Sequence, residues 1–343
     1  MIIGGLLVIL LLVLFLPFLV KPVEHNLEVF LCIMGVLAAL ISGVMNTELI
    51  LHALKDPIMI TLAVLVAGVL FKWLQHPLER SVAAISERIP MGVFAAIIVI
   101  VLGLISSIIT AIIASLVLVA IVSALKLDRK SETLLVVIAC FSIGLGAALT
   151  PIGEPLSTIA ISKLDESFDY LLKLLGAYII PGVVAFGILA AILLKNPSAR
   201  NHGLSENKEE SYLDIVIRAG KVYLFVAGLT FLGAGFSPLI DRYLIHLNSY
   251  VLFWINIISA VLDNATLAAA EISPAMSQDA IQAILLGLVI SGGMLIPGNI
   301  PNIISANKLG ITSKEWARLG VPLGLAAMII YFVIIVLAHM MAA

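Results

Sequence analysis

Carboxylates and amides stand at isolated positions inside long apolar runs of this 343-residue chain. Glu154 interrupts one such run, and Asp263 and Asn264 interrupt another. Unpaired polar groups are costly in hydrocarbon, so they persist only where they line a cavity or meet a partner. Hard cations bind carboxylate, amide and hydroxyl oxygens of this kind. The pattern therefore predicts a cation site built from these interruptions.

Four interruptions supply the candidate ligands. Two are predicted to be tips of re-entrant hairpins, and two are predicted to be unwound centres of helices that contain Pro and Gly. The predicted ion-binding residues are Ser106, Ser107 and Thr110 at the first tip, Thr150, Glu154 and Ser157 at the first break, Asp263, Asn264 and Thr266 at the second tip, and Asn299 and Asn302 at the second break. Glu154 and Asp263 are the predicted ligands of a transported Na⁺. These two residues and Glu271 are the predicted proton-coupling groups.

The charges in these segments favour a cation over an anion. The segments contain carboxylates but no Lys, Arg or His. An anion could bind at helix N-termini, but the carboxylates would oppose it. A desolvated carboxylate holds a proton readily when no metal ion is bound. We therefore expect a monovalent cation and protons to compete for the same oxygens. Asn256 is either a further ligand or a residue that bridges two helices by a hydrogen bond, and we expect the bridge.

The elements that carry these residues are predicted to be membrane-spanning helices. Apolar residues make up 62% of the chain and charged residues 12%, against about 25% charged residues in soluble domains. Apolar runs such as Ile2–Val20, Pro57–Leu74 and Tyr170–Leu194 have the length of a span. Trp254 and Trp316, near span ends, are expected to anchor at the membrane interfaces. The predicted fold class is an all-α polytopic membrane protein.

The composition also argues against several other classes. The formal net charge is −2 and no basic block occurs, so nucleic acid is not an expected partner. The two cysteines lie far apart in apolar runs, which excludes a Cys-rich metal site. We find no nucleophile-elbow, zinc-protease or phosphate-loop motif, so we expect neither an enzyme nor a bound cofactor.

An order of elements occurs twice along the chain: span, interfacial helix, hairpin, broken helix, span. Ile105–Thr110 aligns with Ile258–Asp263, and Gly153-Glu154 aligns with Gly298-Asn299 at an offset of 145. The predicted organisation is a pair of N-terminal spans (1–56), a first repeat (57–194), a cytoplasmic linker (195–211) and a second repeat (212–343). The interfacial helices are predicted at His76–Ile89 and Pro238–Leu247.

The topology follows from the hairpins and the basic residues. If both hairpins are re-entrant, each repeat crosses the membrane three times, and the second repeat is inverted. Fifteen of the 19 Lys and Arg residues then lie on one side, as the positive-inside rule requires. If each hairpin instead crosses the membrane once, the two sides hold 9 and 10 of the Lys and Arg residues. We therefore predict about eight transmembrane helices and two opposed re-entrant hairpins in the cell (inner) membrane, with both termini extracytoplasmic.

Two motifs carry a resemblance to known transporters. Gly146-Ala147-Ala148-Leu149-Thr150-Pro151-Ile152-Gly153-Glu154 resembles the GGAWSPIGD stretch of NhaD-type sodium/proton antiporters, and Leu262-Asp263-Asn264 resembles their LDN hairpin tip. From Glu24 to Asn302 the chain is also similar to a family of prokaryotic predicted cation transporters. That family belongs to the ion-transporter superfamily, which includes arsenite permeases and sodium/dicarboxylate transporters.

The resemblance implies an inverted-repeat homodimer that moves a transport domain in an elevator-like motion. It implies that Glu154 takes the acidic position of the first broken helix and that Asp263 and Asn264 form the second tip. The chain departs from the pattern at 154, where Glu replaces Asp, and at the first tip, which reads Ser-Ser rather than the Ser-Asn-Thr of the dicarboxylate branch. The expected function is therefore Na⁺(Li⁺)/H⁺ antiport, and the alternative is sodium-coupled symport of a small anion such as a dicarboxylate.

Overall fold

The computed structural model describes residues 2–342 apart from 56, 59–60, 63, 67–68, 70–71, 74–88, 126, 195–210, 244–246, 263 and 275. Its regular elements in that part are helices, which confirms the all-α prediction. They include α1 (Ile2–Leu19), α2 (Lys21–His25), α3 (Leu27–Ser42), α5 (Met91–Ile109), α6 (Ala111–Leu125), α7 (Arg129–Ala147), α8 (Pro155–Leu164), α9 (Tyr170–Leu193), α10 (Tyr212–Tyr243), α11 (Ser249–Ile255), η1 (Asn256–Ala260), α12 (Asn264–Glu271), α13 (Gln278–Gly292), η2 (Ile296–Gly298), α14 (Ile300–Leu309) and α15 (Ser313–Ala342).

The helices have the lengths and compositions of a membrane protein. Within the described residues, five helices are long and apolar enough to cross a bilayer: Met91–Ile109, Arg129–Ala147, Tyr170–Leu193, Tyr212–Pro238 and Ser313–Ala338. The first of these is the helix that the sequence predicted as an arm of the first hairpin. Shorter apolar helices include α3 and α6. The chain is therefore a helical membrane protein.

Several predicted boundaries are corrected. Pro238 lies inside α10, which continues to Tyr243, so the separate helix predicted at Pro238–Leu247 is wrong. Proline is tolerated inside a membrane helix because neighbouring groups satisfy the freed carbonyl. The second arm of the second hairpin ends at Glu271 rather than Met276, and Pro274 follows it. The predicted helix His76–Ile89 falls almost wholly outside the described residues.

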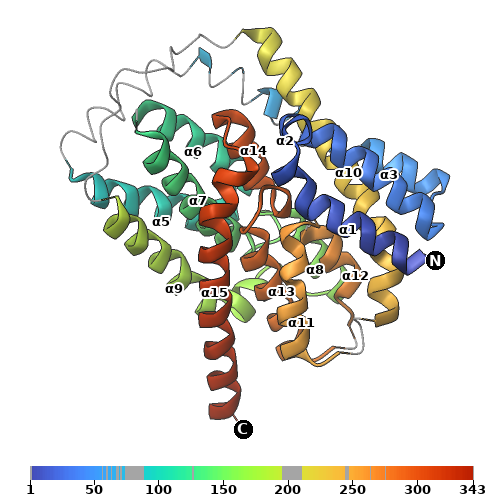
Figure 1. Ribbon diagram of the computed structural model, residues 1–343. Coiled ribbons are helices and arrows are strands. Elements are labelled where there is room, and N and C mark those ends of the chain that lie inside the picture. The colour runs from blue at the N-terminus through green and yellow to red at the C-terminus, as the bar shows by residue number, and fades with distance from the viewer. Residues whose placement is uncertain are drawn as a thin grey trace.

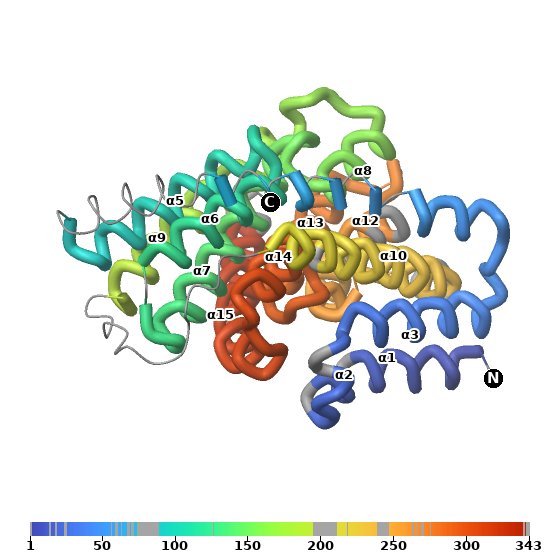
Figure 2. The backbone as a smooth tube through the Cα atoms, turned by 90° about the horizontal axis from the view of Figure 1, so that it is seen from above, coloured from blue at the N-terminus to red at the C-terminus, as the bar shows by residue number. Residues whose placement is uncertain are grey.

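The helices form three groups side by side. Figures 1 and 2 show α5, α6, α7 and α9 at one end, α1, α3 and α10 at the other, and α13, α14 and α15 between them. Helix α8 leaves the first group and packs on α12, and α6 packs on α14. The second halves of both broken helices are therefore held by hairpin arms from the other half of the chain.

Helices α3 and α10 pack closely along their length. A Cβ on Gly35 would lie 2.3 Å from the Gly228 carbonyl oxygen, so only glycine permits this approach. At one end, Lys221 Nζ lies 2.7 Å from Glu28 Oε1, and Glu28 is buried.

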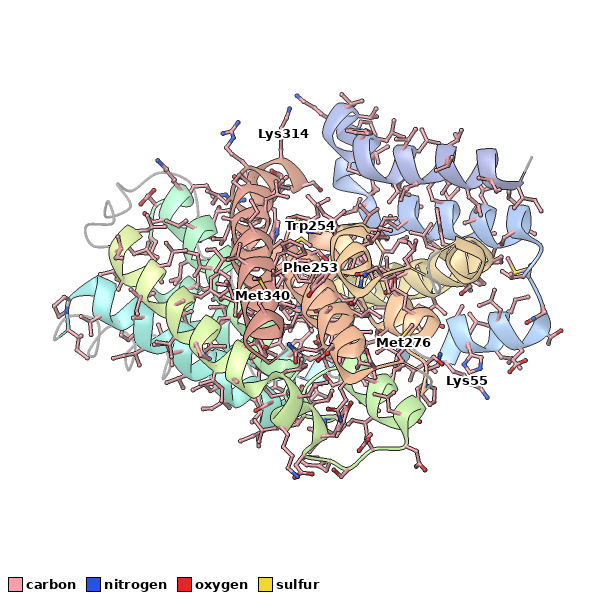
Figure 3. All side chains as sticks on the ribbon, turned by 90° about the horizontal axis from the view of Figure 1, so that it is seen from below. Lys55, Phe253, Trp254, Met276, Lys314 and Met340 are labelled. Atoms are coloured by element: carbon pink, nitrogen blue, oxygen red, sulfur yellow. The ribbon has the colours of Figure 1, made fainter. Side chains whose placement is uncertain are left out.

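Elsewhere in the molecule, α11 packs on α15 through Phe253, Trp254 and Phe332, whose ring centroids lie 5.5–5.8 Å apart. Figure 3 shows Phe253 and Trp254 near the centre of that view.

Candidate functional site

The two helix breaks are built in the same way. Glu154 and Asn299 are the residues before α8 and α14, and both have extended backbones, with φ of −156° and −155°. Each is followed within two residues by a proline, and each helix has 10 residues. Each helix then ends at a left-handed residue, Asp165 or Gly310. Every one of these positions except the second proline keeps the offset of 145 that the sequence predicted.

The first break is bonded to the tip of the first hairpin. The Ala111 N–H donates to the Gly153 carbonyl at 2.8 Å, and the Thr150 hydroxyl donates to the Ser107 carbonyl. Gly153 is required here because a Cβ would lie 2.0 Å from the Ala147 carbonyl oxygen. The predicted residues Ser107, Thr110, Thr150 and Glu154 are thus brought together.

The serines near this break also join helices. The Ser106 hydroxyl lies 2.6 Å from the Gly103 oxygen and 3.0 Å from the Ile143 oxygen, which links α5 to α7. The Ser107 hydroxyl donates to the Leu104 carbonyl at 2.7 Å. Ser157 is fully buried on α8, and its hydroxyl lies 3.5 Å from the Ala147 oxygen. Hydroxyls that donate to carbonyls keep lone pairs with which they can accept, so these serines could still contact a cation.

Thr110, the single residue between α5 and α6, has φ of 76° and ψ of 149°. This region is costly for any residue with a Cβ, and such strain often accompanies functional sites. The Thr110 hydroxyl accepts a hydrogen bond from the Ile113 N–H at 3.3 Å. The tip is therefore strained in its backbone and braced by its side chain.

The second break is braced from within and from α15. The Asn302 side-chain amide donates to the Gly292 carbonyl at 2.8 Å and the Leu295 carbonyl at 2.9 Å. Trp316 Nε1 donates to the Gly293 carbonyl at 3.1 Å, and Trp316 is fully buried. The expectation that Trp316 anchors at the membrane interface is wrong, because its N–H has a buried carbonyl as its partner. No spacing in the sequence signals this contact.

The two breaks approach each other across α7. A Cβ on Gly144 of α7 would lie 2.6 Å from Asn299 Nδ2, so this side chain lies directly against the α7 backbone. The Cys140 thiol lies 3.4 Å from the Ser305 hydroxyl and 3.6 Å from the Pro301 carbonyl oxygen. Sequence reasoning missed Cys140 and Gly144, because their role arises only where α7 meets α14.

Several polar side chains at these breaks are buried. Glu154 is 5% exposed, and Asn264, Asn299 and Asn302 are also buried. In the described part of the chain, Asn302 Oδ1 and Asn264 Nδ2 have no hydrogen-bond partner. Asp263 lies outside the described residues, and so does the side chain of Thr266. The arrangement can offer amide, hydroxyl and carboxylate oxygens to a ligand.

Among the described residues, which do not include Asp263, no group of three or more His, Cys, Asp or Glu could hold a metal ion. Glu271 is the last residue of α12, about two turns beyond the second tip. It is 1% exposed. Any cation here would depend on amide, hydroxyl and backbone oxygens besides a carboxylate.

The two halves are also tied together beyond the breaks. Arg129, at the start of α7, makes paired hydrogen bonds to the Glu315 carboxylate, both at 2.8 Å. The same guanidinium donates to the Leu309 and Gly310 carbonyls, at 2.9 and 2.6 Å, where α14 ends. Carbonyls at a helix C-terminus lack helical partners, so one Arg side chain caps α14 and binds α15. No pattern in the sequence predicts these contacts.

These features define a helical membrane protein with two matched helix breaks, at which Glu154, Asn299 and Asn302 are buried. A family model described as a protein of unknown function (DUF1646) matches residues 3–338. The match covers nearly the whole chain, so this chain belongs to the DUF1646 family. The comparison with curated proteins found no match.

Proposed function

We propose that this protein is a secondary active transporter, a Na⁺(Li⁺)/H⁺ antiporter. The observation that supports this most directly is the pair of matched breaks, which place Glu154 and Asn299 at corresponding positions in the buried centre. Irregular backbone at membrane depth is tolerated where it is buried in protein or lines a cavity. Discontinuous helices of this kind form the ion sites of many secondary transporters.

In the proposed site, Glu154 and Asp263 supply the carboxylates. Amide and hydroxyl oxygens from Asn264, Asn299, Asn302 and the first tip complete the coordination of Na⁺. The unpartnered Asn302 Oδ1 is a ready acceptor for a cation. Protons compete with Na⁺ for the carboxylate oxygens, so release of one allows the other to bind. This competition would couple the two gradients.

We further propose that the two repeats are inverted and work by an elevator motion in a homodimer in the cell membrane. Reciprocal packing supports the inversion: α6 contacts α14, and α8 contacts α12. The close α3–α10 pair, with its Glu28–Lys221 ion pair, is the part of the fold that we assign to the scaffold. In this topology the linker is cytoplasmic and both termini are extracytoplasmic.

A sodium-coupled symporter of a small anion is the second candidate. Asn264 Nδ2 is a buried donor without a partner in the described part of the chain. A donor of this kind suits an oxygen of an anionic substrate rather than a cation. The Na⁺ ligands would be the same in both proposals, but Na⁺ would be exchanged for protons in the first and transported together with the anion in the second.

The test is a transport assay in proteoliposomes that contain a pH-sensitive dye. Addition of Na⁺ or Li⁺ outside should change the lumenal pH, and choline should not. Glu154→Gln and Asp263→Asn should abolish the change, because each removes a carboxylate that binds both ions.

Glu132→Gln is the matched control, because Glu132 is also a buried acid but lies at the start of α7 beside Arg129, 3.6 Å away. It should retain transport. Absence of any cation-dependent pH change, together with Na⁺-dependent uptake of a labelled dicarboxylate, would reject antiport in favour of symport.

A further inference from the structure

Helices α8 and α14 are built alike, but their matched faces are covered to different extents. On α8, Pro155, Thr158 and Ser162 are exposed. They lie three or four residues apart, so they share one face of the helix. The three residues of α14 that match them at the offset of 145 are not exposed. Ile303, the counterpart of Thr158, is only 3% exposed. One of two equivalent faces is therefore open and the other is covered.

The open face of α8, which we call the polar face (Pro155, Thr158 and Ser162), has the composition of a surface in contact with water. It contains two hydroxyls and no large aliphatic side chain. Exposed faces of membrane-spanning helices elsewhere in the described chain differ in this respect. On α9 the exposed residues include Ile180, Val184 and Ile188. Aliphatic side chains suit lipid, whereas polar groups at membrane depth are found mainly where they line a cavity. The polar face therefore fits an aqueous surrounding.

The polar face runs from the first break to one surface of the membrane. It begins directly after Glu154, and Ile152, on the other side of Glu154, is exposed as well. The 10 residues of α8 rise about 15 Å, which is half of a hydrocarbon core of about 30 Å. A break at the middle of the membrane would thus be connected to the surface along this helix. At the second break, Gly298 and Pro301 are both buried.

The matched face of α14 lines a pocket of about 240 Å³ that this helix shares with α3 and α10. The lining includes Ile303 and Asn307 of α14, Leu27 of α3 and Phe225 of α10. Gly310, just after α14, also lines the pocket and is exposed. The pocket therefore reaches the surface at the end of α14, which is the cytoplasmic end in the proposed topology.

Apolar side chains stand between this pocket and the second break. Ile303, which lines the pocket, directly follows Asn302, and it is buried. Ile296, which also lines the pocket and is buried, precedes Asn299 by three residues. These side chains offer no oxygen to a cation that leaves its hydration shell. The second break is therefore closed toward the pocket.

We propose that the polar face of α8 is the outer half of the ion path and that the structure is the outward-open state. The cation and its water reach Glu154 along Thr158 and Ser162, and the pocket beside Ile303 is the closed cytoplasmic end. Since the repeats are proposed to be inverted, exchange of the two arrangements would cover α8 and open α14. The inference rests on the proposed transporter function and deepens it, because it assigns the route of the ion.

The test measures how fast single cysteines react with an impermeant maleimide in the full-length protein without Cys32. The protein is held in lipid nanodiscs, where the reagent reaches both faces of the membrane. A thiol reacts as its thiolate, which forms in water but not in hydrocarbon. Thr158→Cys and Ser162→Cys should therefore react at least about tenfold faster than the control Ile180→Cys on the aliphatic face of α9. Equal rates at the three positions would overturn the proposal, since lipid or another chain would then cover the polar face.

Ile303→Cys is the matched variant in the second repeat, because Ile303 is the counterpart of Thr158. It should react about as slowly as Ile180→Cys, since its position is closed in the outward-open state. A rate equal to that of Thr158→Cys would remove the difference between the two ends and reject this state. In intact cells the reagent should label Ser162→Cys without permeabilisation. Labelling that requires permeabilisation would reject an outer position of the path.

The labelling rates need no transport, so this inference and the proposed function can fail separately. Fast reaction at the polar face of a protein that causes no Na⁺-dependent pH change in liposomes would reject antiport and leave the aqueous path standing. If antiport is observed, a maleimide attached at Ser162→Cys should abolish it, because the adduct fills the path. Antiport that continues at its full rate in the labelled protein would show that ions take another route.

Discussion

At the scale of single residues, Thr110 carries the clearest sign of local strain. Its φ of 76° places it in a region that residues with a Cβ rarely adopt. Neighbouring contacts hold it there: the Ala111 N–H is bonded to Gly153, and the Thr150 hydroxyl to Ser107. The strain is thus maintained by the first break, which the sequence placed beside this tip.

The strain predicts an unusual order of stability for two substitutions at this tip. Thr110→Gly should be more stable than Thr110→Ala by about 1–3 kcal/mol, since both lose the hydroxyl but only glycine accepts this backbone at no cost. Thermal unfolding in detergent would measure the difference. At a helical or strand position with ordinary φ, the alanine variant is usually more stable than the glycine variant. A Thr110→Ala protein that is more stable than Thr110→Gly would therefore contradict the strained tip.

At the scale of elements, glycine decides how α5 and α7 cross. A Cβ on Gly146 would lie 1.7 Å from the Gly103 carbonyl oxygen. The crossing positions the first tip against the first break, because Ser106 and Ser142 bond across the same contact. Small residues that allow this close approach are common between membrane helices.

Two glycine substitutions should therefore have opposite effects. Gly146→Ala should destabilise the protein by about 1–3 kcal/mol through overpacking. Gly220→Ala on α10, where a new Cβ would meet nothing within 4 Å, should stabilise it by about 0.5–1 kcal/mol through lower chain entropy. Thermal unfolding of both variants would test this pair, and equal effects would contradict the packing described for α5 and α7.

The start of α7 gives a prediction about pH. Asp128 caps this helix by accepting from the Lys130 and Ser131 N–H groups, and hydrogen bonds, chiefly from the Ser131 side chain, lower the pKa of Asp128 below its ordinary value. Because the folded-state pKa is depressed, the cap stabilises above about pH 4, the unfolded value, and weakens as pH falls below it.

Asp128→Ala should accordingly cost about 1 kcal/mol at neutral pH. The difference in melting temperature between the wild-type protein and this variant should shrink as the pH is lowered below about 4. A difference that stays constant across this range would mean that the ionised cap contributes nothing. Asp214→Ala is the comparison variant, because Asp214 is also an acidic residue near the start of a helix, in the first turn of α10.

At the scale of the whole molecule, the proposed topology assigns Lys314 to the cytoplasmic side and Lys55 to the outside. Both side chains are exposed, and Figure 3 shows them pointing outward at opposite edges of the molecule. In a variant without Cys32, an impermeant maleimide should label Lys55→Cys in intact cells. It should label Lys314→Cys only after permeabilisation. The reverse pattern, or equal labelling of both, would refute the orientation.

The sequence alone determined that the chain is helical and where two of its helices are interrupted. Long apolar runs must form internally bonded helices in a bilayer, and Pro and Gly at Thr150–Pro155 and Pro297–Pro301 predicted where two of them break. The repeat offset of 145 also predicted that the residues before α8 and α14 are equivalent, and both have the same extended backbone. These are local properties, set by hydrophobicity and backbone geometry within a few residues.

Only the tertiary structure decided which distant groups meet. Trp316 reaches the Gly293 carbonyl, Arg129 caps α14, and Asn299 lies against Gly144. Each contact joins segments more than 20 residues apart, and several partners are backbone atoms, which have no signature in the sequence. The boundary at Pro238 was mispredicted for a related reason, since packing around a membrane helix compensates for a lost hydrogen bond. Hydrophobicity decides which segments are helical, whereas side-chain shape and hydrogen bonding at helix crossings decide how they are assembled.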